Sequence, residues 1–400
     1  MENAPLRYDV RLMFSRRTDW KLAANRFTNA LDEARASGSE LIDLTISNPT
    51  RAGLIYDSAA ILDALRNDRS LDYDPQSKGL LSAREAVTGY YRDRGETVDP
   101  ESLILTTGTS EAYSFVFRLL ANPGDEILVA KPSYPLFDFL ADLQDVKLIP
   151  YSLIYDHGWQ IDSHTLEQAV TEKSRAIVLV HPNNPTGSYV SPPERERLNE
   201  LCRKHNLALL VDEVFLDYGH DGSRAQSFVG NNAALTFALS GISKISGLPQ
   251  MKLGWIAVSG PEAQVKPALD RLEVIADTYL SVSAPVQGAA STFMEQRKSI
   301  QAQLIARIRT NLAGLDRRLA AQKTCSRLKL EGGWYSVLRV PVTRSDEELA
   351  ISLLREKRVI VHPGNFYDFL QEGYLVLSLI AEEDNFDDGV QRLLNFVGDT

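Results

Sequence analysis

A lysine in a loop rich in serine and glycine is the first residue whose setting favours chemistry. Lys244 stands in Ser-Gly-Ile-Ser-Lys-Ile-Ser-Gly, shortly after the apolar run Leu235–Leu239. An amine that is partly removed from water has a lowered pKa and becomes nucleophilic toward a carbonyl group. Because a lone loop lysine is usually solvated, this interpretation depends on the residues that lie around Lys244.

A carboxylate pair follows a second apolar run. Asp212 and Glu213 stand at the end of Leu207–Val211. A carboxylate beside a buried strand needs a partner, which could be a protonated pyridine nitrogen, a metal ion or a helix N-terminus. No companion residue stands at a metal-ligand spacing, so we predict no metal site.

Three further loops begin where an apolar run ends. Thr107–Ser110 opens a helical pattern and could hold a phosphate on hydroxyls and free N–H groups, or form an ordinary helix cap. Two prolines flank Tyr134, which could stack on a flat ring or simply pack. The segment His181–Gly187 contains Asn184, whose amide could donate to a ring oxygen, or it could be a structural turn.

The runs that precede these loops predict an α/β fold. They are short and apolar throughout, as expected for strands that are covered by helices on both faces. Helical patterns such as Glu111–Leu120 and Glu194–His205 lie between them, which favours a mostly parallel sheet whose carboxyl-end edge collects all five loops. The seven predicted strands are Leu103–Thr106, Glu126–Ala130, Val146–Pro150, Ala176–Val180, Leu207–Val211, Leu235–Leu239 and Trp255–Ser259.

The pattern changes after about residue 262, which predicts a second domain. We predict an N-terminal arm and helix over residues 1–50 that pack with the small domain, a large domain over 51–278, and a small α+β domain over 279–400. The region around Glu262–Thr278 would join the two larger parts. The elements expected outside the large sheet are a helix at Leu22–Ser37, a long helix at Gln287–Gln322, a strand at Tyr335–Val340, a helix at Asp346–Glu356 and a strand at Tyr374–Ile380.

Composition excludes several classes of protein. The chain has 400 residues, with 43 basic and 53 acidic side chains and a net charge of −10, so nothing draws it electrostatically to nucleic acid or an anionic membrane. Cys202 and Cys325 form no C-x-x-C pair. Met1–Leu12 lacks the apolar run of a secretory signal, and no stretch approaches the ~20 apolar residues of a membrane span. We therefore expect a cytoplasmic protein.

Taken together, these motifs resemble those of class I/II aminotransferases, which are fold-type I enzymes dependent on pyridoxal 5′-phosphate. The resemblance runs from Asn48-Pro49 to the Pro363-Gly364 and Leu377-Ser378 region, which is most of the chain. It rests on Asn-Pro-Thr-Gly, Asp-Glu and Ser-x-x-Ser-Lys elements in that order. It implies a large domain with a mostly parallel, seven-stranded sheet and a smaller C-terminal domain.

The resemblance also implies roles for individual residues. Lys244 would carry the cofactor as an internal aldimine and act as general acid and base. Asp212 would pair with the pyridinium nitrogen, Asn184 would donate to the ring oxygen, and Tyr134 would stack on the ring. The phosphate contacts would come from Gly108, Thr109, Ser110, Ser243 and Lys252, with Tyr73 reaching the phosphate of a neighbouring subunit in a homodimer.

Three positions depart from the family pattern. Lys252 replaces the usual arginine, so we expect looser cofactor binding. Phe215 stands where the family often has a tyrosine, which should raise the pKa of the lysine-bound cofactor. Val376 occupies the position of the arginine that holds the substrate carboxylate. Asn48 and Arg51 are candidate substrate contacts. Arg51, or Arg16 or Arg17 of the N-terminal arm, could replace that arginine unless each is a solvated surface residue.

The leading functional hypothesis is an aminotransferase (a transaminase) that moves an amino group from an amino acid to a 2-oxo acid. A lyase that eliminates at a C–S bond would use the same cofactor residues, so the motifs do not separate the two. A regulator without catalysis is disfavoured, because the first 50 residues are too few and too mixed in charge for a helix-turn-helix domain. The sequence does not identify the substrate.

Overall fold

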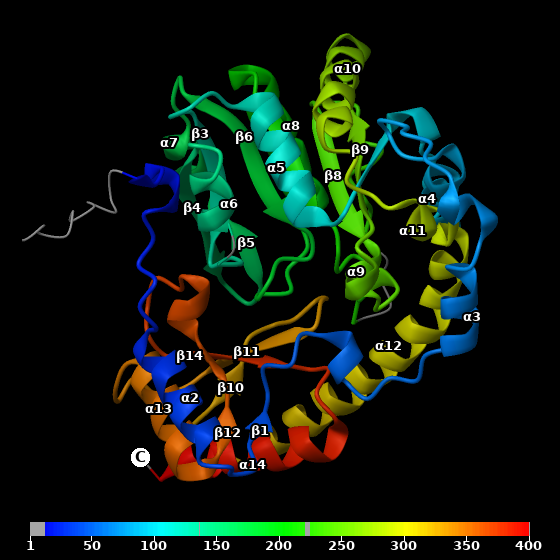
Figure 1. Cartoon of the computed structure of the whole chain (residues 1–400). Helices are drawn as coiled ribbons and strands as arrows, with labels where there is room; N and C mark the ends of the chain where they lie inside the picture. Colours follow the sequence, from blue (N-terminus) through cyan, green and yellow to red (C-terminus); the bar gives the residue numbers. More distant parts are fainter. Residues whose placement is uncertain (1–12, 136, 221–224, 400) are drawn as a thin grey trace, which may run out of the picture.

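A computed structural model describes residues 13–135, 137–220 and 225–399. The segment Met1–Leu12, in which the sequence predicts no secretory signal, lies outside the described residues. Figure 1 shows a large sheet in the upper half of the molecule and a smaller one in the lower half. No helix among the residues that the structure describes is long and apolar enough to cross a membrane.

The large sheet confirms the predicted mostly parallel sheet. Five strands run parallel in the order β8-β7-β6-β3-β4, and β9 is antiparallel to both of its neighbours. The sheet has eight strands rather than seven, because a short strand after β4 turns back onto its edge. In spatial order they are β2 (Leu103–Thr106), β9 (Gly254–Ser259), β8 (Thr236–Gly241), β7 (Ala208–Asp212), β6 (Ser174–Val180), β3 (Glu126–Lys131), β4 (Lys147–Tyr155) and β5 (Trp159–Ile161).

Helices cover both faces of this sheet, which explains why its central strands are apolar throughout. Successive side chains of a strand point to opposite faces. On β2, Ile104 packs into a core with α5, α6 and α10, whereas Leu103 and Leu105 pack with α4 and α12. Farther along the sheet, Leu209 and Val211 pack with α7 and α8 on the latter face.

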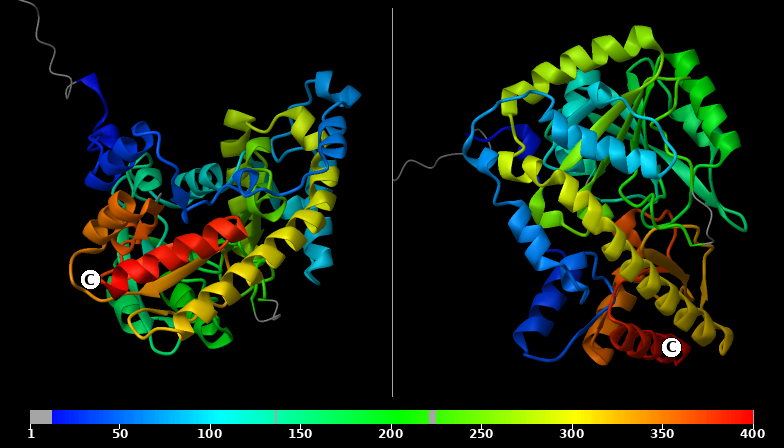
Figure 2. Two further views of the ribbon diagram at one scale, coloured as in Figure 1. Left: turned by 90° about the horizontal axis from the view of Figure 1, so that it is seen from below. Right: turned by 90° about the vertical axis from the view of Figure 1, so that its right-hand side faces the viewer.

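The helices alternate with the strands over the large sheet and then extend beyond it (Figures 1 and 2). Helix α8 shows how the sequence sets their ends: Ser191 and Glu194 form a capping box at its start, and Asn206 closes it in the left-handed conformation. The helices are α2 (Arg26–Ala36), α3 (Ser58–Ala64), α4 (Leu81–Asp93), α5 (Thr109–Leu120), α6 (Phe137–Asp142), α7 (Ser163–Ala169), α8 (Pro192–His205), α9 (Ile242–Ile245), α10 (Glu262–Tyr279), α11 (Ala284–Gly288), α12 (Ala290–Ala320), α13 (Asp346–Lys357) and α14 (Glu383–Gly398).

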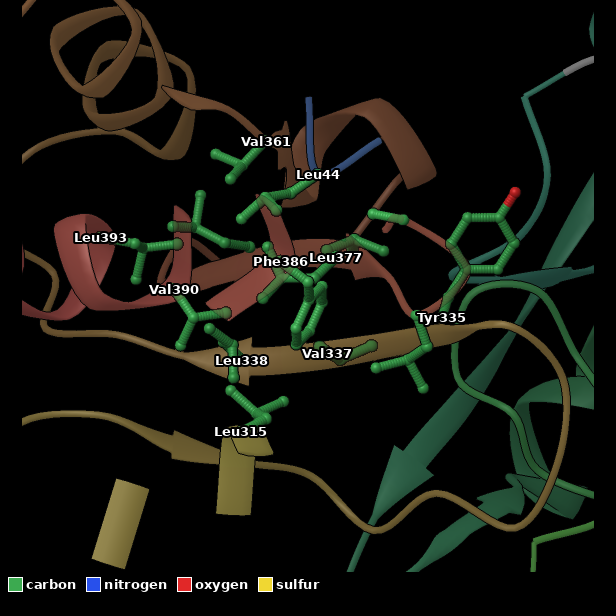
Figure 3. Close-up of a cluster of buried hydrophobic side chains, with 14 of the residues drawn as sticks. Leu44, Leu315, Tyr335, Val337, Leu338, Val361, Leu377, Phe386, Val390 and Leu393 are labelled. Carbon is green, nitrogen blue, oxygen red and sulfur yellow. The ribbon is translucent and has the colours of Figure 1, made fainter. Parts of the chain in front are cut away.

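The C-terminal part contains a four-stranded antiparallel sheet in the order β10-β11-β14-β13. Its apolar core includes Leu315, Leu338, Leu377 and Phe386, drawn in Figure 3. A two-stranded parallel pair joins the N-terminal segment to this part of the chain. These strands are β10 (Ser326–Arg327), β11 (Tyr335–Arg339), β14 (Tyr374–Ser378) and β13 (His362–Pro363), with β1 (Ile42–Asp43) beside β12 (Val359–Ile360).

Two connecting segments differ from the sequence prediction. The region expected to join the two parts is an 18-residue helix, α10, which packs against α5 and the β2 and β9 strands. Its apolar side chains, such as Leu272 and Ala276, recur with helical spacing, but Pro267 conceals the pattern. The long helix predicted over Gln287–Gln322 divides into α11 and α12, and α12 runs from the large sheet toward the small one (Figure 1).

Candidate active site

A cavity of about 220 Å³ opens at the carboxyl-end edge of the large sheet, where the chain faces β11 of the small sheet. It collects most of the residues that the sequence singled out and adds several that the sequence did not. Its lining residues are Ser47, Thr109, Ser110, Tyr134, Phe137, Val180, Asn184, Asp212, Val214, Phe215, Ser243, Lys244 and Tyr335.

Lys244 lies in α9, the four-residue helix that follows β8. Its Nζ donates a hydrogen bond to the Ser47 carbonyl oxygen at 3.1 Å. The same nitrogen lies 5.0 Å from the ring centre of Trp334 and 5.7 Å from that of Phe215. Burial lowers the pKa of Lys244 to about 8, against the opposing effect of Asp212. A substantial fraction of the amine is therefore neutral near pH 7 to 8, as a nucleophile requires.

Asp212 ends β7 and points into the cavity. Its Oδ1 accepts the backbone N–H of Val214 at 3.1 Å, and its Oδ2 accepts the Tyr113 hydroxyl at 3.2 Å. Burial raises the pKa of Asp212 to about 6, while these hydrogen bonds and Lys244 act in the opposite direction. The carboxylate is thus mainly ionised at neutral pH and can face a cationic ring nitrogen.

Glu213, the other half of the acidic pair, has a structural role. Successive residues at a strand end point to opposite sides. The Glu213 carboxylate accepts the Ser227 hydroxyl and the Phe228 backbone N–H, both at 2.6 Å, and it does not line the cavity. Only Asp212 of the pair is therefore available to a ligand.

Asn184 presents an unsatisfied amide to the cavity. The side chain is buried, and its Oδ1 has no hydrogen-bond partner among the described residues. Its neighbour Asn183 is satisfied, since its Oδ1 accepts the Thr186 hydroxyl at 2.9 Å. A buried amide without a partner costs free energy, and a 180° turn of the group presents either oxygen or N–H to a ligand. This orphaned amide supports the ligand role of Asn184 over a purely structural turn.

The start of α5 forms an anion-binding corner. Thr109 and Ser110 are its first two residues, and their N–H groups have no partner within the helix. A side-chain carbon placed on Gly108 would come 3.8 Å from Nζ of Lys252, so that ammonium lies beside the turn. Ser243 lines the cavity one residue before Lys244. Hydroxyls, free N–H groups and an ammonium together can hold a phosphate.

Aromatic side chains wall the cavity. Tyr134 remains 43% exposed, and its ring meets that of Phe137 edge-on with centres 6.4 Å apart. Phe215 packs against Trp334 and Tyr335, with ring centres 5.2 and 6.1 Å away. A flat ligand ring would therefore lie between apolar walls, and Phe215 offers it no hydroxyl.

Five predicted residues do not line the cavity: Gly108 and Lys252 lie beside it at the start of α5, and the other three are Asn48, Arg51 and Tyr73. Asn48 caps the short 3-10 helix η2 (Pro49–Arg51), accepting the backbone N–H of Thr50 at 3.0 Å. Both Asn48 and Arg51 are exposed, because η2 turns the chain outward directly after Ser47. Tyr73 is 83% exposed and lies in a separate groove with Gly79 and Ser281. The roles assigned to these three residues stay predictions.

Two lining residues with hydroxyl groups, Ser47 and Tyr335, were not predicted from the sequence. Ser47 immediately precedes the Asn48-Pro49 pair, at which the family resemblance begins. Tyr335 follows Gly332-Gly333-Trp334 at the start of a predicted strand. Both come from segments far from the large sheet in sequence, so the strand-end rule could not find them. A Trp-Tyr pair directly after two glycines was the signal available.

Comparison with known proteins identifies the family. The protein-family model described as aminotransferase class I and II matches residues 39–393 of this chain. The chain therefore belongs to the class I and II aminotransferases. It is a pyridoxal 5′-phosphate-dependent enzyme that transfers an amino group between an amino acid and a 2-oxo acid.

Relatives and solved structures agree with this assignment. A glutamate-pyruvate aminotransferase of Haemophilus influenzae is 27% identical over 376 residues, covering 90% of this chain and 92% of that protein. An alanine aminotransferase of Mycobacterium tuberculosis is 26% identical, covering 90% of this chain and 86% of that protein. The structure of an alanine aminotransferase from Pyrococcus furiosus shares the fold with a TM-score of 0.86 at 21% identity, covering 97% of this chain and all of that one.

The residues of the cavity fit this cofactor. The cofactor aldehyde requires a neutral amine, which Lys244 can supply. The pyridinium nitrogen requires a carboxylate, which Asp212 can supply, and the ring oxygen requires a hydrogen-bond donor, which Asn184 can supply. All three residues line one cavity. Among the described ranges, no group of three or more His, Cys, Asp or Glu residues is placed to hold a metal ion.

Proposed function

We propose that Lys244 carries the cofactor of this aminotransferase and moves the proton of the reaction. The observation that supports the proposal is an amine of lowered pKa in the same cavity as a buried carboxylate and an orphaned amide. Pyridoxal 5′-phosphate supplies an electron sink for the charge left on the α-carbon of the substrate. The Lys244 amine would act as the general base that takes the α-proton of the substrate and as the general acid that returns it.

The other residues hold and tune the site. Asp212 would keep the ring nitrogen protonated, Asn184 would donate its amide to the ring oxygen, and Tyr134 would stack on the ring. The rings of Phe215 and Trp334, whose centres lie 5.7 and 5.0 Å from Nζ, reduce the contact of the Lys244 amine with water. Gly108, Thr109, Ser110, Ser243 and Lys252, at the start of α5 and beside α9, would hold the phosphate.

Replacement of Lys244 by alanine tests this assignment. We expect the variant to lose the absorbance band of covalently bound cofactor, since no other lysine among the described residues lines the cavity. Its turnover should decrease by at least about 10³-fold. Lys266→Ala is the matched control, because Lys266 is exposed and pairs only with Asp270 one helical turn away. Unchanged turnover in Lys244→Ala would remove the proposal.

We further propose that the donor and acceptor include alanine, glutamate and their 2-oxo acids, as named for the two relatives above. The reaction outcome needs its own check, because an S-alkyl-thiohydroximate lyase of Arabidopsis thaliana is also 27% identical, covering 84% of this chain and 75% of that protein. In transamination, each molecule of the added 2-oxo acid that is consumed gives one molecule of the corresponding amino acid. Release of ammonia without an acceptor would instead indicate elimination.

A homodimer is the proposed assembly, with each active site completed by Tyr73 of the neighbouring subunit. Large apolar side chains are exposed on nearby segments: Leu71 is 92%, Ile55 79% and Tyr279 51% exposed. Such a surface is expected to be covered in solution. Sedimentation should give twice the chain mass, and mixing Tyr73→Ala with Lys244→Ala subunits should restore one intact site per hybrid dimer. A monomeric, active enzyme would contradict the assembly.

The proposed domain division is an N-terminal arm and helix within residues 1–50, a large domain over 51–278 that would contain the large sheet, and a small domain over 279–400 that would contain the small sheet. Limited proteolysis followed by mass spectrometry would test these boundaries. The proposed location is the cytoplasm, with no nucleic-acid or membrane partner, and fractionation of the source cells would test it.

A further inference from the structure

Among the residues that the structure describes, no arginine lines the cavity, and this bears on which amino-group donors the enzyme accepts. Lys244 is the only cationic side chain of the described ranges in the cavity wall. In the proposed function, on which this inference rests, its amine is bound to the cofactor when a donor enters. From its own subunit, the carboxylate of an amino acid would then meet only neutral groups on the substrate side of this wall.

Three arginines of the N-terminal segment and of α12 are directed elsewhere. Arg307 donates to the carbonyl oxygens of Ala52 and Ala381 at 3.2 and 3.3 Å. Arg17 pairs with Asp145 at 2.5 Å, and Arg51 is exposed beyond the cavity. None of these guanidinium groups is therefore positioned as a bidentate carboxylate clamp.

The position in β14 where the family pattern has an arginine is apolar. Val376 is fully buried in β14 and pairs with Val337 of β11 and His362 of β13. His362 is itself engaged with the Tyr367 hydroxyl at 3.1 Å, and burial lowers its pKa to about 4, so it is neutral. The interior of the small sheet thus holds no cation here that a carboxylate could reach.

Two hydroxyls stand where the substrate enters. Figure 3 shows the Tyr335 hydroxyl pointing away from the apolar cluster that its strand helps to form. Tyr335 and Ser47 both line the cavity, and each carries a hydroxyl group. Burial raises the pKa of Tyr335, so this residue stays a neutral donor at every physiological pH.

We infer that this aminotransferase contacts the carboxylate side of its donor through the Tyr335 and Ser47 hydroxyls alone, and that it also accepts primary amines without an α-carboxylate. A carboxylate that loses water without gaining a cation has little net advantage in binding. A primary amine with an apolar substituent avoids that desolvation and fits walls made by Phe137, Val214 and Phe215.

The overall reaction with such a donor is balanced. R–CH₂–NH₃⁺ and R′–CO–COO⁻ give R–CHO and R′–CH(NH₃⁺)–COO⁻. The C–N bond of the amine breaks and a C=O bond forms in its place, while the 2-oxo acid loses its keto oxygen and gains a C–N and a C–H bond. The amine carbon is oxidised by two electrons, and the acceptor carbon is reduced by the same two.

Matched donors test the inference in the holoenzyme. The ratio of kcat/KM for L-phenylalanine over 2-phenylethylamine, with pyruvate as acceptor, should lie within about tenfold, because neutral hydrogen bonds contribute modestly. A ratio of about 10³ or more would indicate a charged clamp and overturn the inference. If L-alanine and L-phenylalanine are both inert, the proposed function itself fails, which is a different result.

Variants and an equilibrium measurement locate the contact. Tyr335→Phe should raise KM for L-phenylalanine about fivefold with little change for 2-phenylethylamine. Tyr155→Phe is the control, because the Tyr155 hydroxyl accepts a hydrogen bond from the Lys329 backbone N–H, away from the cavity.

Calorimetry tests the same contact at equilibrium. The Kd values of 3-phenylpropionate and 3-phenylpropanol for the holoenzyme should lie within about fivefold of each other. If Arg51→Ala lowered kcat/KM more than about 100-fold for L-phenylalanine but not for 2-phenylethylamine, an arginine would hold the carboxylate, and this result would contradict the inference.

Discussion

The Tyr113 hydroxyl donates a hydrogen bond to Oδ2 of Asp212 at 3.2 Å, and both side chains are buried. Tyr113 lies in the second turn of α5, whose first turn carries Thr109 and Ser110. One short helix therefore supports the carboxylate at the proposed ring-nitrogen position and forms the proposed phosphate corner. The bond also favours the ionised carboxylate, opposing the burial that raises the pKa of Asp212 to about 6.

Tyr113→Phe should weaken cofactor binding in a pH-dependent manner. Without the donor, the pKa of Asp212 rises further above 6, so the carboxylate becomes protonated at a higher pH. A hydrogen bond to a charged group contributes about 1.5 kcal/mol, which corresponds to roughly tenfold in Kd. Titration of the apoenzyme with pyridoxal 5′-phosphate should show the larger loss at pH 6 and a smaller one at pH 8.

Tyr151→Phe serves as the control for that experiment. Tyr151 is an equally buried tyrosine, but its hydroxyl donates to the Val178 carbonyl, outside the cavity. It should change the stability of the fold and leave the Kd of the cofactor unchanged. A Tyr113→Phe enzyme whose Kd matches the wild type at both pH values would show that the bond is merely structural.

Lys252→Arg should tighten cofactor binding. The Lys252 ammonium lies beside the Gly108 turn as a single point charge, whereas a guanidinium can hold two phosphate oxygens at once. We expect a decrease of about tenfold in Kd, measured by equilibrium dialysis of the apoenzyme. The exposed Lys266→Arg controls for the change of side chain. If Kd moves by less than about twofold, the geometry of the turn does not admit a bidentate contact.

Phe215→Tyr should lower the pKa of the lysine-bound cofactor. Phe215 lines the cavity, and a hydroxyl on its ring would donate to an ionised ring oxygen of the ligand. One such bond, worth about 1.5 kcal/mol, lowers the pKa by about one unit. An absorbance titration of the holoenzyme measures this value directly. An unchanged pKa would mean that the new hydroxyl points away from the ligand.

Much of the site could be predicted from the ends of the apolar strands. Thr109, Ser110, Tyr134, Asn184, Asp212 and Lys244 all follow such strands and all line one cavity. This works because parallel strands deliver their carboxyl ends to a common edge. The same local rule predicted each strand of the large sheet except β5, which is too short to show a pattern.

The side of the cavity that faces the substrate could not be predicted in this way. Ser47 and Tyr335 reach the cavity from the N-terminal segment and from β11, more than 280 residues apart in the chain. Tyr113 lies within a helix, where its spacing indicates only a buried face. Their contacts depend on how the small sheet packs against the large one, which no local pattern encodes. The sequence predicts Asn48 and Arg51 as substrate contacts for the same reason: no local pattern shows that η2 directs both outward.

Lys244→Met should stabilise the apoenzyme. The pKa of Lys244 is lowered to about 8 in the folded chain from an ordinary value of 10.5, so folding disfavours its charged form. That cost is fully present below pH 8 and disappears as the pH rises from 8 to 10.5. The apolar replacement carries no such cost and should add on the order of 1 to 3 kcal/mol to the free energy of unfolding at pH 7.

Urea unfolding of the two apoenzymes at pH 7 and at pH 10 measures this difference. The advantage of Lys244→Met should shrink at the higher pH, whereas a packing effect of the methionine would be the same at both. Lys266→Met should show no advantage at either pH, because that lysine is exposed. An apoenzyme that is destabilised by Lys244→Met at pH 7 would mean that the contacts with Ser47, Phe215 and Trp334 outweigh the cost of burying the amine.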